Sequence, residues 1–213
     1  MLKIIFVCFI FLTTAVCADE SNNAKAAATN AQLGLAYLNK NMYPQAQSRL
    51  QTALQEDPNS PASWYSMAYY YEKTSNLKLA DQYYQKAISI DSHSGSAYNN
   101  YGTFLCRQGN YKAAISEFLT AIDQKNYAFV AGAYENAGMC ALRIPNRPLA
   151  QQYFEKAIDN NPNMPYSLLC LARLNFKNGN TVAAERYFTE FSQIAGVTTA
   201  QITQFRAQVF KKT

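Results

Sequence analysis

Small residues recur along this chain at a regular, long spacing, and larger apolar residues keep the same spacing. The small residues are 34, 34, 36 and 34 positions apart and stand at Gly34, Ala68, Gly102, Gly138 and Ala172. Three further series share these steps, and their first members are Ala46, Leu50 and Ala53. Four registers with one period, all with the same two-residue insertion near residues 128–130, predict a solenoid of repeated helical units.

The pattern inside each unit resembles the tetratricopeptide repeat, in which two antiparallel helices form one unit. It is fullest in the second unit, at Trp64, Ala68, Tyr71, Ala80, Tyr84 and Ala87. We therefore expect an all-α fold, a right-handed superhelical solenoid of about five helix pairs, closed by a capping helix at 199–213. The five units fill residues 27–198 and are predicted at Ala27–Ser60, Pro61–Ser94, Gly95–Ala128, Ala131–Met164 and Pro165–Thr198.

Residue size and turn chemistry support this register. A small residue on one helix can face a large residue on the other, which lets the two backbones approach within about 8–10 Å. The large residues are Leu50, Tyr84, Phe118, Phe154 and Phe188, and the aromatic spacing predicts that Tyr71, Tyr101 and Tyr134 are also core residues. Turns inside the units carry residues that accept left-handed backbone or cap a helix: Asn41-Met42, Ser75-Asn76, Gly109-Asn110, Pro145-Asn146 and Gly179-Asn180.

The first residues have the pattern of a secretory signal peptide. Lys3 precedes an apolar run from Ile4 to Leu12, which is shorter than the roughly 20 apolar residues of a membrane span. Two processing sites fit the sequence. Cleavage after Ala18 gives a signal peptide of 1–18, whereas lipoprotein processing gives a signal of 1–16 and an acylated Cys17. Residues 19–28 are small and polar, and we expect a flexible lead-in there.

Composition and charge restrict the function. The 213 residues are 49% hydrophobic and 15% charged, which is typical of a packed domain rather than a disordered chain. The net charge is +5 without a long basic run, so we do not expect nucleic-acid binding. His93 is the only histidine, and no phosphate loop or nucleophile elbow occurs, so we expect no metal, no cofactor and no enzymatic activity. Membrane contact is expected only through an N-terminal lipid.

In tetratricopeptide arrays the first helix of each unit lines the concave face, mainly at its second, fifth, ninth, twelfth and thirteenth positions. This resemblance places a peptide-binding groove at Leu35, Leu38, Tyr65, Tyr69, Asn99, Thr103, Arg107, Met139, Leu142, Tyr166, Arg173 and Phe176. These residues are mostly aromatic and aliphatic, which favours an apolar peptide, helical or extended, over a highly charged one. Arg107 and Arg173 are either solvated charges or anchors for that peptide.

Three cysteines, Cys106, Cys140 and Cys170, lie in the predicted repeats. Cys106 and Cys140 are on the first helices of neighbouring units, and those helices pack side by side. An oxidising compartment would permit a disulfide between them, while the other interpretation is three small buried apolar side chains. A disulfide would close a loop of about 35 residues and stabilise the fold by roughly 3–4 kcal/mol on the chain-entropy model.

Four strings of residues match a known family beyond the general repeat pattern: 31–38, 80–87, 99–106 and 134–142. They resemble the type IV pilus biogenesis and stability protein family (PilF/PilW), and the resemblance extends from about residue 30 to residue 195. It implies an outer-membrane lipoprotein of Gram-negative bacteria, a pilotin that helps secretin subunits to localise and assemble into a ring. The implied partner is the pilus secretin subunit or another pilus assembly protein. The resemblance also favours the Cys106–Cys140 disulfide.

Two other classes of function are compatible with parts of the sequence. A general periplasmic adaptor or chaperone for envelope or secretion complexes would use the same groove for many ligands. A hydrolase would need a polar cluster, which the predicted groove lacks. Without acylation, the protein would be soluble in the periplasm rather than anchored at the periplasmic side of the outer membrane.

Overall fold

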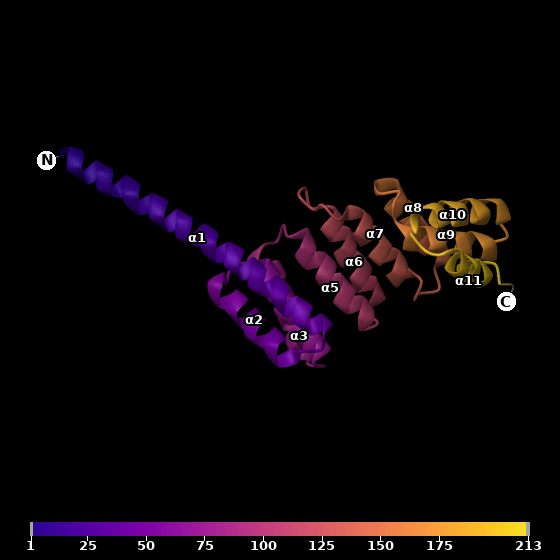
Figure 1. Ribbon diagram of the computed structural model, residues 1–213, viewed down its shortest axis with the longest axis horizontal. Helices are drawn as coiled ribbons and strands as arrows, with labels where there is room; N and C mark the ends of the chain where they lie inside the picture. The colour runs from indigo at the N-terminus through magenta and orange to yellow at the C-terminus, as the bar shows by residue number, and fades with distance from the viewer. Residues whose placement is uncertain (1, 212–213) are drawn as a thin grey trace. The chain divides into compact units, whose positions relative to one another are not determined.

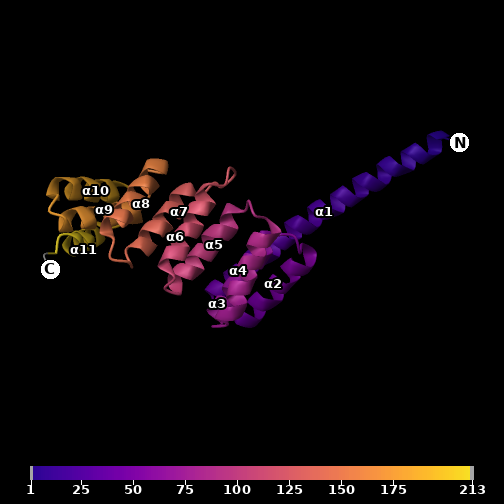
Figure 2. The same ribbon diagram turned by 180° about the vertical axis from the view of Figure 1, so that it is seen from behind.

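The regular structure of this protein is helical throughout the part that the computed structural model describes, residues 2–211 (Figures 1 and 2). Side chains are described from Ser21 onwards. The predicted all-α fold is confirmed. The helices are α1 Leu2–Asn39, α2 Tyr43–Glu56, α3 Pro61–Lys73, α4 Leu77–Ile90, α5 Gly95–Arg107, α6 Tyr111–Ile122, α7 Val130–Ala141, α8 Arg147–Asn160, α9 Pro165–Lys177, α10 Thr181–Ile194 and α11 Thr199–Val209.

The helices form two compact units, of which unit 1 ends at Tyr101 and unit 2 begins at Gly102. In unit 1, α1 packs against α2 and α3, and α3 packs against α4. In unit 2, the helix pairs α7–α8 and α9–α10 are each in close contact, α8 packs against α9, and α11 lies against α9 (Figure 1). Successive antiparallel helices are the arrangement that the 34-residue period predicts.

The large residue of each repeat is buried, and in three repeats it lies directly against the glycine at the small position. Leu50, Tyr84, Phe118, Phe154 and Phe188 are all at most 2% exposed. At Gly138 the approach is so close that an added Cβ would lie 2.8 Å from Cε1 of Phe154. Only glycine leaves room for a ring at that distance, so the packing predicted from residue size is present in the structure.

The turns between the helices of a repeat have the predicted chemistry. Asn41, Ser75, Gly109 and Gly179 all have positive φ, between 57° and 84°. Asn76, which follows Ser75, and Asn180, which follows Gly179, each cap the next helix. Asn76 accepts a hydrogen bond from the backbone N–H of Leu79, and Asn180 accepts one from the backbone N–H of Ala183. These residues stop one helix and start the next, because they tolerate left-handed backbone and satisfy free N–H groups.

The last repeat is covered by α11, whose first turn carries a capping box. The Thr198 hydroxyl accepts a hydrogen bond from the backbone N–H of Gln201, and the Gln201 side chain accepts one from Thr198. The Phe205 ring lies 5.4 Å from Phe191, and Phe210 lies 5.7 Å from Phe188. The helix therefore supplies apolar contacts that a further repeat would otherwise provide.

Three tyrosines expected in the core are only half-buried. Tyr71, Tyr101 and Tyr134 lie at the edge of the helix packing, and the Tyr101 hydroxyl donates to Oδ1 of Asp81 at 2.9 Å. A phenol oxygen is costly to bury without a partner, which favours a position where the ring packs and the hydroxyl reaches a polar group. These three tyrosines are therefore partly exposed and are not the core residues that the sequence predicts.

The N-terminal segment is part of α1. Residues 19–28, for which the sequence predicts a flexible lead-in, are helical in the structure, and Ala27 is fully buried. The side chain of Cys17, the predicted lipidation site, lies outside the described side chains. Among the residues that were described, no helix is both long enough and apolar enough to span a membrane.

Candidate functional site: two peptide-binding surfaces

Unit 1 presents a tyrosine surface, which we define as Leu35 on α1 with Tyr65 and Tyr69 on α3. All three side chains are half-buried. Leu35 and Tyr69 rest on a buried cluster that includes Met67. The Lys73 ammonium lies 5.4 Å from the centre of the Tyr69 ring, within reach of a cation–π interaction. The buried cluster supports Leu35 and Tyr69 while leaving part of each side chain available to a ligand.

Burial affects the chemistry of this surface. Desolvation raises the pKa of the Tyr65 phenol, so the ring stays neutral over the whole physiological range. A neutral, partly buried aromatic surface binds apolar side chains by contact area and offers hydroxyl groups for single hydrogen bonds. The tyrosine surface therefore has the character that the sequence predicts for the groove.

Leu38 is not a groove residue. The sequence places it on the ligand-binding face, but the side chain is only 1% exposed. It belongs to the same buried cluster as Leu50 and Met67. The physical reason is that α1 packs against α3 as well as α2, so the α1 face that carries Leu38 is covered.

The residues of α5 that the sequence predicts for the groove are divided between the two units. Asn99 lies in unit 1, whereas Thr103 and Arg107 lie in unit 2. Asn99 and Thr103 are half-buried, and Arg107 is exposed at the last residue of the helix.

A disulfide joins α5 to α7 within unit 2. It links Cys106 to Cys140, whose Cα atoms are 5.8 Å apart. Cys140 is fully buried, and Cys106 is half-buried. The bond fixes the first helices of two successive repeats to each other.

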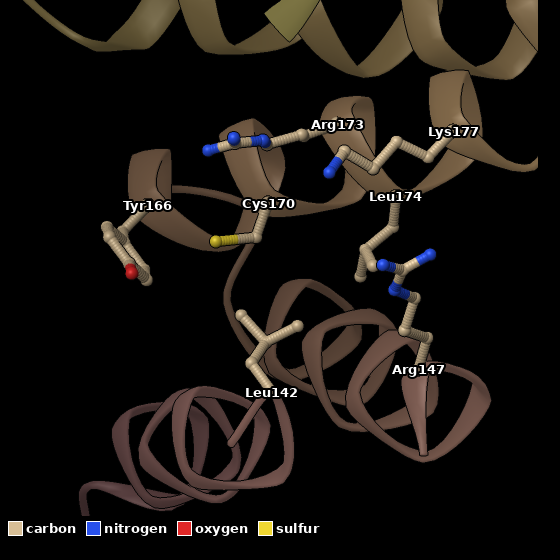
Figure 3. Close-up of a pocket in the computed structure, with 7 residues that line it drawn as sticks. All are labelled: Leu142, Arg147, Tyr166, Cys170, Arg173, Leu174 and Lys177. Carbon is tan, nitrogen blue, oxygen red and sulfur yellow. The ribbon is translucent and has the colours of Figure 1, made fainter. Parts of the chain in front are cut away.

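Unit 2 contains an open cavity of about 240 Å³, which we call the basic cavity (Figure 3). Leu142 and Arg147 reach it from the end of α7 and the start of α8, and α9 forms the facing wall. The lining residues are Leu142, Arg147, Tyr166, Cys170, Arg173, Leu174 and Lys177. Three of them, Leu142, Tyr166 and Arg173, were predicted as groove residues.

Two other predicted residues of this unit lie elsewhere. Met139 is 41% exposed but does not line the basic cavity. Phe176 is half-buried, and its ring lies 5.1 Å from that of Phe210, so it packs against the end of the capping helix. The first helix of the last repeat thus uses Phe176 to hold the cap and uses other positions to line the cavity.

The basic cavity is more charged than the sequence predicts. Arg147, Arg173 and Lys177 all line it, and across residues 21–211 none of them forms an ion pair with a carboxylate. The expectation of a groove with few charges is wrong for this part of the chain. Lys177 occupies the thirteenth position of its repeat, so the positional rule could have found it. Arg147 begins the second helix of the preceding repeat, where that rule does not look.

The inner wall of the cavity is desolvated. Burial raises the pKa of the Cys170 thiol to about 11, and the charge of Glu135 adds to this effect, while a hydrogen bond with Tyr166 and the charge of Arg173 oppose it. Glu135 itself accepts hydrogen bonds from the backbone N–H of Ser167 at 3.1 Å and from its hydroxyl at 2.7 Å. The cavity therefore combines an apolar, neutral interior with positive charge at its edge.

These repeated helix pairs, with side chains presented on the first helix of each pair, define a tetratricopeptide-repeat protein. Models of the tetratricopeptide repeat match residues 31–95 and 83–116. The chain is 32% identical over 200 residues to the type IV pilus assembly protein PilF of Pseudomonas aeruginosa, covering 91% of this chain and 79% of PilF. It belongs to this family of type IV pilus proteins.

Solved structures agree with this assignment. The structure of Pseudomonas aeruginosa PilF matches with a TM-score of 0.76 over 88% of this chain and 84% of PilF. The structure of PilW, described as a widely conserved type IV pilus biogenesis factor, matches with a TM-score of 0.72 at 26% identity, covering 86% of this chain and 84% of PilW. Proteins built on this repeat generally act as interaction scaffolds rather than as enzymes.

Proposed function

We propose that this protein is a non-catalytic scaffold of type IV pilus biogenesis, which helps secretin subunits to reach the outer membrane and to multimerise. The observation that carries the proposal is the 32% identity with Pseudomonas aeruginosa PilF across 91% of the chain. A match of that length includes both compact units, so it concerns the whole binding array and not one repeat.

The surfaces of the molecule are suited to holding a polypeptide. The tyrosine surface offers partly buried aromatic rings, and the basic cavity offers an apolar hollow with cationic side chains. Aromatic and arginine side chains are the residues that most often contribute large shares of binding energy in protein interfaces. Within residues 21–211, no group of three histidine, cysteine or acidic side chains is arranged to hold a metal ion.

The N-terminal sequence supports export and anchoring. The apolar run from Ile4 to Leu12, which follows Lys3, fits an export signal, and Cys17 lies close enough behind it to be the site of lipid attachment. We propose that the mature protein lies at the periplasmic side of the outer membrane. The Cys106–Cys140 disulfide is consistent with an oxidising compartment of this kind.

Complementation tests the proposal. The chain is expressed in Pseudomonas aeruginosa lacking PilF, and secretin multimers are measured by immunoblot in separated inner and outer membranes. We expect multimers to return to the outer membrane. In detergent extracts of the organism that encodes this chain, we expect its secretin to copurify with the protein. Copurification of many unrelated envelope proteins without secretin would instead indicate a general periplasmic adaptor.

The anchor is tested separately. Cys17→Ser is expected to move the protein from the membrane fraction to the soluble periplasm, because a stable lipid attachment would be lost. Intact-mass measurement of the mature N-terminus provides the matched observation, since acylation adds the mass of the lipid to Cys17. An unchanged distribution and a mature chain that begins at Asp19 would show that cleavage after Ala18 is the correct interpretation.

A further inference from the structure

The basic cavity carries an unbalanced positive charge. Arg147, Arg173 and Lys177 surround one hollow, and no carboxylate within the described residues forms an ion pair with any of them. The nearby acid, Glu135, is engaged by two hydrogen bonds from Ser167 and is not part of the lining. Like charges that converge on a cavity repel one another, and a bound anion relieves that repulsion.

The rest of the lining is apolar. Leu142 and Leu174 lie on facing walls in Figure 3, and Tyr166 borders the hollow at its end. Leu142 is 38% exposed and Tyr166 is 45% exposed, although both are large and hydrophobic. A ligand that fits this surface has an apolar side chain beside its negative charge, which a free inorganic anion lacks.

The spacing of two cations suggests the form of the ligand. Arg173 and Lys177 are four residues apart on α9, which places them one turn and about 6 Å apart along the helix. Alternate side chains of an extended peptide point to the same side and are about 6.6–6.8 Å apart. Two acidic side chains at alternate positions of an extended peptide would therefore meet both cations, and Arg147 would face them from the opposite wall.

We propose that the basic cavity binds an extended segment of the partner polypeptide that carries acidic side chains at alternate positions next to an apolar residue. This inference rests on the proposed function, because it names the chemistry of the partner segment that the scaffold holds. It assigns acidic recognition to unit 2 and leaves apolar recognition to the tyrosine surface of unit 1.

Peptide binding to the oxidised full chain tests the inference. Short fluorescent peptides with blocked termini contain leucine followed by Glu-Ala-Glu, Gln-Ala-Gln or Lys-Ala-Lys, and binding is followed by fluorescence anisotropy. We expect the glutamate peptide to bind about tenfold more tightly than the glutamine peptide at low ionic strength, and the difference to shrink as salt is added. Equal affinity of the two peptides would overturn the proposal.

A charge exchange distinguishes direct contact from a general effect of charge. The double variant Arg173→Glu/Lys177→Glu is expected to lose the glutamate peptide and to bind the lysine peptide instead. Lys125→Glu changes an exposed cation of the same unit that does not line the cavity, and it should leave both affinities unchanged. Circular dichroism and thermal unfolding check that each variant is folded. If Lys125→Glu weakens binding as much as the double variant, net charge and not the cavity is responsible.

Two further outcomes separate this inference from neighbouring hypotheses. If vesicles with anionic lipids bind through Arg147, Arg173 and Lys177 while the peptides do not bind, the cavity is a lipid site and the proposal is wrong. If the double variant still copurifies with secretin as the unaltered protein does, the scaffold function stands and the acidic segment is not its contact. Loss of secretin in the double variant, with binding retained in Lys125→Glu, would support both.

Discussion

The same position of the repeat has different chemistry in the two units. The ninth residue of the first helix is Tyr69 on α3 of unit 1 and Arg173 on α9 of unit 2, and the thirteenth residue is a lysine in both. In unit 1 the lysine, Lys73, lies over the Tyr69 ring. In unit 2 the lysine, Lys177, lines the basic cavity together with Arg173. At the ninth position, unit 1 therefore has an aromatic ring paired with the lysine, whereas unit 2 has a second cation beside it.

In this repeat fold, the residues that stabilise the packing are different from those available to bind a ligand. The residues that hold the helices together, such as Leu50 in unit 1 and Phe154 in unit 2, are buried in both units. The residues that differ lie on the exposed side of the first helix, where a substitution changes the ligand without disturbing the packing. Unit 2 also has a covalent link between two repeats, the Cys106–Cys140 disulfide.

The largest expected difference between the units concerns this link. Replacing both cysteines, Cys106→Ala with Cys140→Ala, is expected to lower the free energy of unfolding of unit 2 by about 3–4 kcal/mol, because the unfolded chain is no longer restricted by a closed loop. Denaturant unfolding gives the magnitude, and hydrogen exchange locates it, with faster exchange in α6–α10 than in the parent protein. Cys170→Ala is the matched control. Equal losses of protection in α2–α4 would show that the two units unfold together.

The second test asks whether the cationic edge or the apolar wall of the basic cavity has the larger effect on the pKa of Cys170. The pKa of Cys170 is raised to about 11 from an ordinary value of 9.0, so at pH 8 its thiolate fraction is about 100-fold lower than that of a free thiol. We expect alkylation by iodoacetamide, followed at Cys170 by peptide mapping, to be slower by about that factor than in the urea-unfolded chain. The rate should rise with pH up to about 11.

The sign of this shift also bears on stability. A group with a raised pKa in the folded state favours folding below its unfolded pKa and loses that contribution as pH rises from 9.0 to about 11. Alkylation of folded Cys170 faster than in the unfolded chain would mean that the nearby cations lower its pKa, and the description of an apolar interior would be wrong.

The third test addresses the tyrosine surface. Tyr65→Ala with Tyr69→Ala is expected to weaken binding of the proposed secretin partner about tenfold while helical content remains near native, because two aromatic contacts are removed. Unlike the cavity variants, this loss should change little with salt. Tyr43→Ala is the matched control, since Tyr43 packs against the same buried cluster from α2. The same affinity in the double variant and the control would remove the tyrosine surface from the binding site.

Much of the fold follows from the sequence because its causes are local or periodic. The contact of Gly138 with Phe154 has counterparts in Gly34 with Leu50 and Gly102 with Phe118. The turns at Ser75-Asn76 and Gly179-Asn180 carry their own conformational preference. Such signals depend on residue size and backbone geometry, which are visible without knowing the rest of the structure. The predicted repeats begin at Pro61, Gly95 and Pro165, which are also the first residues of α3, α5 and α9.

The surfaces were harder to predict because each depends on several helices. Leu38 satisfies the groove pattern, but the contact between α1 and α3 buries it. Arg147 comes from a second helix, so a rule that reads first helices alone describes a nearly uncharged groove. The half-buried Tyr101 shows the same limit, since its place at the edge depends on Asp81 of the preceding repeat.

The last test concerns what both units share, the contact of a small residue with a large one. Gly138→Ala places a Cβ 2.8 Å from Cε1 of Phe154, so we expect a loss of about 1–2 kcal/mol in the free energy of unfolding, partly offset by the better helix propensity of alanine. Gly132→Ala, on the same helix with nothing within 4 Å of its Cβ, should instead stabilise the protein by about 0.5–1 kcal/mol. Chemical denaturation measures both values. If Gly138→Ala lowers the free energy of unfolding while Gly132→Ala raises it, close packing explains why a small residue recurs every 34 residues. If Gly138→Ala stabilises the protein, the small residues serve some other purpose.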